Sequence, residues 1–126
     1  MKKYLFLPLS FLLSVSALAD SYVGQLQTTT HRSGREKAVS FIYKIDTSNK
    51  ENITGTLEIS GPLTKCSGQY DLAGGSIKNN SVALITKKHE REGCASPDFK
   101  GVVDGNNFVG KITWRGSQND IVLEKD

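Results

Sequence analysis

The chain has 126 residues, 37% of them hydrophobic and 23% charged, a balance that suits one folded domain with a single core. Its formal charge of +3 rests on 16 basic and 13 acidic residues, and two of the basic ones are Lys2 and Lys3 at the start. Without that start the chain is nearly neutral, so no overall field steers it to nucleic acid or an anionic membrane, and we expect neither as a partner.

The first 19 residues have the three-part pattern of a secretory signal peptide. Two lysines precede an apolar stretch over residues 4–13, and Ala17 and Ala19 supply the small-residue ending. We therefore predict cleavage after Ala19, a single domain over 20–126, and a periplasmic or secreted location. The apolar stretch is shorter than the run of about 18 residues that crosses a bilayer, and no second such run follows, so we expect a soluble product with no membrane insertion.

Alternation of apolar and polar residues predicts strands along almost all of the remaining chain, with polar turns between them. No segment of about ten residues has a helical period. We predict eight antiparallel strands, at about 21–28, 36–46, 52–60, 66–78, 81–88, 98–103, 107–114 and 119–125. The pair Gly74-Gly75 predicts a bulge in the long fourth strand.

Five glycines recur midway between two apolar or sulfur residues, a spacing that places each glycine on the inner face of its strand: Gly24, Gly55, Gly68, Gly101 and Gly110. Glycine weakens a strand interior, so its repeated inward placement indicates sharp bends or a narrow interior. We predict an all-β fold, a small single-domain antiparallel up-and-down β-barrel of about eight strands. The pattern resembles avidin-like and lipocalin-like barrels in architecture alone, which transfers no binding residue. The many bulky inward residues favour a filled interior over a lipocalin-type ligand cavity.

The two cysteines, Cys66 and Cys94, belong to the exported part of the chain. An even pair in an oxidising compartment most simply forms a disulfide, and the spacing is not the Cys-x-x-Cys of redox proteins. We predict a structural disulfide that stabilises the fold by about 3–4 kcal/mol.

A simple meander places alternate connections at opposite ends of the barrel. The connections expected at about 29–35, 61–65, 89–97 and 115–118 then share one end, which we call the long-loop end, and both cysteines fall there. This end collects both histidines and six basic side chains, including all four arginines, beside the single tryptophan. We predict a contact surface made of His31, Arg32, Arg35, Lys65, His89, Arg91, Trp114 and Arg115.

Two functions fit this surface. The first is recognition of an anionic or sugar-containing small ligand, because arginine suits carboxylate and phosphate groups and an indole stacks on sugars. The second is a protein–protein role, as an inhibitor of a secreted enzyme or as an accessory subunit. Trp114 itself fits either a plug of the core or the floor of a ligand site.

Enzymatic chemistry has little support. The sequence contains no nucleophile elbow, recognisable carboxylate pair or phosphate-binding loop, so we expect no enzyme and no cofactor. His31 and His89 lack metal-ligand spacing, so we expect no metal. An outer-membrane barrel is disfavoured because charged residues such as Lys44, Glu58 and Lys111 fall on the outer face, where lipid requires an apolar band. We expect a monomer.

Overall fold

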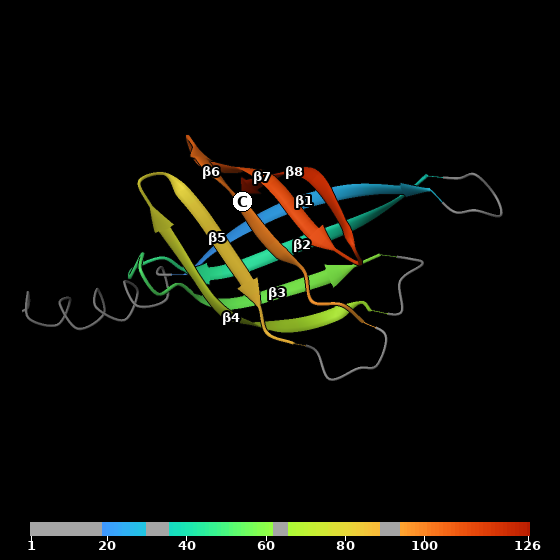
Figure 1. Cartoon of the computed structure of the whole chain (residues 1–126), viewed down its shortest axis with the longest axis horizontal. Helices are drawn as coiled ribbons and strands as arrows, with labels where there is room; N and C mark the ends of the chain where they lie inside the picture. Colours follow the sequence, from blue (N-terminus) through green and yellow to red (C-terminus); the bar gives the residue numbers. More distant parts are fainter. Residues whose placement is uncertain (1–18, 30–35, 62–65, 89–93) are drawn as a thin grey trace, which may run out of the picture.

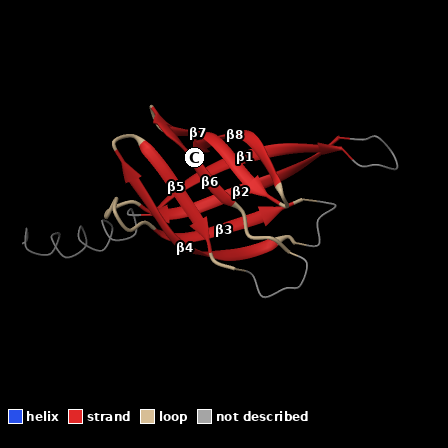
Figure 2. Cartoon of the chain, in the orientation of Figure 1, coloured by secondary structure: helices blue, strands red, loops and turns tan. Residues whose placement is uncertain are grey.

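The computed structural model describes residues 19–29, 36–61, 66–88 and 94–126, and in these ranges it consists of strands joined by turns and loops (Figures 1 and 2). The strands are β1 (Ala19–Thr29), β2 (Glu36–Asp46), β3 (Thr54–Ser60), β4 (Gly68–Lys78), β5 (Ser81–Thr86), β6 (Asp98–Asp104), β7 (Asn107–Trp114) and β8 (Ser117–Lys125). Each pairs antiparallel with the next, and β8 returns to β1, which closes a barrel. The predicted all-β, up-and-down barrel of eight strands is confirmed.

β4 changes neighbours along its length. Its first part pairs with β3 as far as Asp71, and its second part pairs with β5 from Leu72 onward. The register shifts between Leu72 and Gly74, so the bulge falls at Ala73, just before the predicted Gly74-Gly75 position. A bulge increases local twist and bends the strand, which lets β4 belong to both walls of the barrel.

Several strand boundaries differ from the prediction by one or two residues, including the starts of the third, fourth and eighth strands. Ile53, placed inside the third strand, precedes β3 and donates its N–H to the Gly75 carbonyl at 2.9 Å. The fourth strand begins at Gly68, two residues after Cys66. The eighth begins at Ser117, because a two-residue turn with positive φ, Arg115 at 55° and Gly116 at 78°, replaces the longer loop expected over 115–118. Such left-handed turns match the twist of the paired strands.

Side chains from all eight strands occupy the barrel interior. Fully buried members include Phe41, Tyr43, Ile45, Leu57, Leu84, Phe99, Ile112 and Leu123. Tyr22 stacks on Phe108 with ring centroids 4.2 Å apart. Leu72 and Val103, expected in the core, are partly buried and pack against it. The filled interior that the sequence favours is thus the arrangement in the described part of the chain.

The inward glycines are close approaches of backbone to backbone. Gly101 and Gly110 face each other across β6 and β7, and a Cβ on Gly110 would overlap the Lys100 carbonyl. Gly68 is the exception: it is exposed, and a Cβ there would meet open space. The register places Gly68 opposite the buried Ile59, on the strand face of Tyr70, but at the start of β4, with a φ of 137°, it approaches no neighbouring backbone among the described residues.

Candidate binding surface at the long-loop end

The meander brings the ends of β1, β3, β5 and β7 together with the starts of the strands that follow them, as the sequence analysis expected. The predicted His31, Arg32, Arg35, Lys65, His89 and Arg91 lie outside the described residues. Trp114 and Arg115 are described, at the end of β7 and in the turn to β8. The predicted surface is therefore represented in the structure by these two side chains and by the strand ends around them.

Trp114 closes the core at this end. Its side chain is 6% exposed, and it meets the ring of Phe41 edge to face with centroids 5.3 Å apart. Its indole N–H donates to the Ala95 carbonyl at 3.2 Å. The exposed Arg115 guanidinium carbon lies 5.4 Å from the centre of the Trp114 ring, a cation–π contact. The geometry places Trp114 as a plug of the core, with Arg115 as the accessible group above it.

The predicted disulfide is confirmed and lies at the same end. Cys66 and Cys94 are bonded, with Cα atoms 5.4 Å apart, and so join the segment before β4 to the segment before β6. The Tyr70 hydroxyl donates to the Cys66 carbonyl at 2.6 Å. The Ser96 hydroxyl donates to the Lys87 carbonyl at 2.9 Å. These contacts fix the strand ends on either side of the bridge.

A two-stranded ribbon projects from this end. β1 and β2 remain paired out to Thr29 and Glu36. Their pairing with the rest of the barrel stops earlier, at Val23↔Glu124 on the β8 side and at Ser40↔Ser60 on the β3 side. In Figure 1 the far ends of β1 and β2, at the long-loop end, extend past the start of β8. A two-stranded ribbon is at best marginally stable alone.

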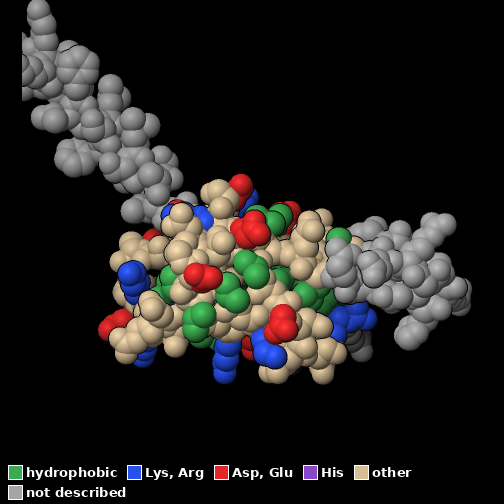
Figure 3. Space-filling view, turned by 90° about the horizontal axis from the view of Figure 1, so that it is seen from above, with side chains coloured by type: hydrophobic (Ala, Val, Ile, Leu, Met, Phe, Trp, Pro, Cys, Tyr) green, Lys and Arg blue, Asp and Glu red, His purple; other side chains and the backbone are tan. Residues whose placement is uncertain are grey.

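A shallow groove runs along the seam between β1 and β8. It has a volume of about 480 Å³ and is lined by Val23, Gly24, Gln25, Val122, Glu124, Lys125 and Asp126. Val122 continues a row of outward valines, paired in register with Val109 and then Val102, and it is 43% exposed. Hydrophobic side chains gather in the middle of the face seen in Figure 3. This row was not predicted from the sequence, although the valines stand among outward positions that are otherwise mostly polar.

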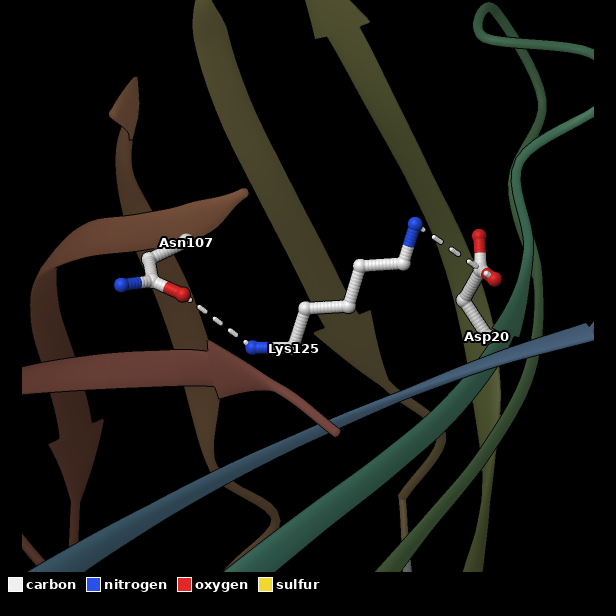
Figure 4. Close-up of polar contacts among 3 residues, drawn as sticks. All are labelled: Asp20, Asn107 and Lys125. Atoms are coloured by element: carbon white, nitrogen blue, oxygen red, sulfur yellow. Dashed lines mark hydrogen bonds and ion pairs between the residues drawn. The ribbon is translucent and has the colours of Figure 1, made fainter. Parts of the chain in front are cut away.

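The opposite end, with the short turns, carries a separate hollow of about 250 Å³. Lys125 closes one side of it: its ammonium lies 3.8 Å from Asp20, and its backbone N–H donates to Asn107 (Figure 4). Its lining includes the buried Tyr22 and Phe108 and the exposed Lys50. Burial raises the pKa of the Tyr22 hydroxyl, and the Asp20 carboxylate raises it further.

Among the described residues, no cluster of three or more His, Cys, Asp or Glu side chains is placed to hold a metal ion. The same residues include no helix that is long and apolar enough to cross a membrane. Comparison with protein-family models, curated proteins and solved structures finds no match for this chain.

Tyr43 of β2 and Thr86 of β5 form a buried polar pair inside the barrel. Neither hydroxyl has a hydrogen-bond partner among the described residues. Burial raises the pKa of Tyr43, the Asp98 carboxylate raises it further, and the nearby Thr86 hydroxyl lowers it slightly without reaching the geometry of a hydrogen bond. An unpaired hydroxyl that is buried loses water contacts without compensation.

Replacement of Tyr43 by Phe should therefore leave the free energy of unfolding unchanged or raise it by up to about 1 kcal/mol. Tyr70→Phe is the matched control, because it removes a buried hydrogen bond to Cys66 and should lower stability by about 1–2 kcal/mol. Urea denaturation measures both. An equal loss in the two variants would contradict the reading that the Tyr43 hydroxyl is unpaired.

Proposed function

We propose that this chain is an exported, non-catalytic binding module that contacts a protein partner through the long-loop end. It would act as an inhibitor of a secreted enzyme or as an accessory subunit. The observation that carries the proposal is the β1–β2 ribbon, which projects from this end with both outer edges outside the barrel ladders. A projecting element fits the concave or open surface of another protein better than it encloses a small molecule.

The filled interior supports the same conclusion. A lipocalin-type carrier holds its ligand inside the barrel, whereas here the interior positions carry packed side chains such as Phe41, Tyr43 and Phe99. The disulfide at the same end of the barrel is compatible with an oxidising compartment and stiffens the strand ends that border the surface.

An anionic or sugar-containing small ligand at this end is the second candidate. The exposed guanidinium of Arg115 above the Trp114 ring favours it, because a cation held over an aromatic face can bind a carboxylate or phosphate. The indole is covered, so such a ligand would contact Arg115 and the neighbouring loops rather than stack on Trp114.

The test uses the chain from residue 20 onward, immobilised and exposed to the secreted and periplasmic fraction of the producing cells. Bound proteins and small molecules are identified by mass spectrometry, and the affinity of each is then measured. Arg115→Ala, and separately Arg32→Ala with Arg35→Ala, should weaken binding about 5- to 150-fold per lost charged hydrogen bond, with an unchanged melting temperature. Binding should also weaken as salt rises.

Lys50→Ala, on the hollow at the short-turn end, is the control and should bind like the parent. A retained protein would support the first candidate, and a retained anionic or sugar ligand would support the second. Loss of binding in Lys50→Ala, with full binding in the arginine variants, would move the functional site to the opposite end and contradict both.

A further inference from the structure

The seam between β1 and β8 closes over a short distance only. Its ladder consists of Tyr22↔Lys125 and Val23↔Glu124, followed by the bond from the Asp126 N–H to the Ser21 carbonyl at 2.8 Å. At Gly24 the strands still lie close, since a Cβ there would sit 2.8 Å from the Val122 carbonyl oxygen. Beyond this point β1 continues to Thr29 without a ladder partner on the β8 side.

The direction of the free backbone groups follows from the bond at Ser21. Its carbonyl points toward β8, and backbone groups on one side of a strand recur at every second residue. The N–H and C=O groups of Gln25 and Gln27 therefore point to the open side, whereas those of Leu26 point toward Val39 on β2. An edge of this kind is ready to pair with another strand.

The β1 edge lacks the features that keep strand edges apart. Residues 25–29 are Gln, Leu, Gln, Thr and Thr, with no charge and no proline. Two other strand edges lie outside the ladders of the described residues, and both carry charged residues. The start of β2 has Glu36 and Lys37, and the edge of β8 that faces β1 has Asp120. Natural proteins protect exposed edges with charged residues or proline, and only the β1 edge goes without them here.

We propose that two copies of this chain associate by antiparallel pairing of their β1 edges over residues 25–29. The pairing is two-fold symmetric, with Gln27 opposite Gln27 and Gln25 opposite Thr29. The same edge of each copy therefore supplies the backbone hydrogen-bond partners of the other. The arrangement has room because the far end of β1 extends past β8 (Figure 1). The second copy also covers part of the seam groove beside Val23 and Val122. Five residues span only about 17 Å of strand, so the interface is small and the dimer is weak, dissociating in the micromolar to millimolar range.

The experiment compares the parent chain from residue 20 onward with two variants by sedimentation velocity, from about 1 μM to about 1 mM. The parent and Gln25→Ala should show the same concentration-dependent dimer, because alanine keeps the backbone N–H. Gln25→Pro removes that N–H on the open side, where proline fits a strand edge, and should weaken dimerisation at least about tenfold. Circular dichroism checks that the proline variant remains folded.

Hydrogen exchange of the parent is the second measurement, and it decides the matter even if Gln25→Pro does not fold. The amides of Gln25 and Gln27 should gain protection as concentration rises, while the amide of Val122 on the facing edge should not. A parent that stays monomeric throughout, a Gln25→Pro variant that dimerises as strongly as Gln25→Ala, or protection that appears at Val122 instead would overturn the proposal. These outcomes concern the association of two copies through the β1 edge of the ribbon, whereas the function proposed above is tested separately, by capture of a foreign partner and by the arginine variants.

Discussion

Gly110→Ala should lower the free energy of unfolding by about 3 kcal/mol, even though it adds a single methyl group. The methyl would overlap the Lys100 carbonyl and the Cα of Gly101 on the neighbouring strand, so β6 and β7 would have to move apart. Neither obstacle is a flexible side chain that could rotate away. Because the inner face at this point is backbone against backbone, the strain passes directly into the ladder of the barrel.

Gly74→Ala is the matched control. It makes the same chemical change next to the β4 bulge, where the new Cβ meets no atom within 4 Å and the backbone needs no positive φ. We expect a change within about 0.5 kcal/mol, or slight stabilisation through a less flexible unfolded chain. Thermal and urea denaturation of both variants tests this difference, and equal losses would show that β6 and β7 can separate without cost.

Period-two alternation accounts for most of the fold that could be predicted. In β7, Phe108, Ile112 and Trp114 are buried and alternate with the exposed Lys111 and Thr113, as the sequence indicates. Strand pairing between sequence neighbours then needs only short turns. Local pattern therefore determined the meander, the buried face and the end at which the cysteines meet.

Features that depend on three-dimensional geometry were harder to predict. The β1–β8 seam joins the two ends of the barrel, and where it opens depends on the tilt and twist of every strand rather than on any local motif. The Arg115-Gly116 turn did have a signal, since glycine accepts the left-handed conformation, but the polar residues at 117 and 118 resembled loop. Of the residues predicted for the candidate site, only Trp114 lies in a segment with strand alternation, which predicts the direction of its side chain. The others lie in predicted loops, where no periodic pattern predicts the position of a side chain.

The disulfide gives the other large effect expected. Replacing both Cys66 and Cys94 by serine should lower the free energy of unfolding by about 3.5 kcal/mol, because a bond across a sequence separation of 28 restricts the unfolded chain. The double substitution avoids a lone reactive thiol. The strand order should survive, since the ladders on either side of β4 and β6 do not include the cysteines.

The loss should also be visible at Trp114, the only tryptophan in the chain. Its indole donates to Ala95, the residue that follows Cys94, so release of the bridge should loosen this cap and shift the fluorescence to longer wavelength. Urea denaturation with and without a reductant provides the check: the reductant should bring the parent down to the stability of the double variant and leave the variant unchanged. The prediction would be contradicted if the reductant did not change the stability of the parent, and if the double variant were as stable as the parent with the same emission wavelength. The bridge would then neither stabilise the barrel nor hold the cap over Trp114. In that case the rigidity of the long-loop end would have to come from the strand ladders alone.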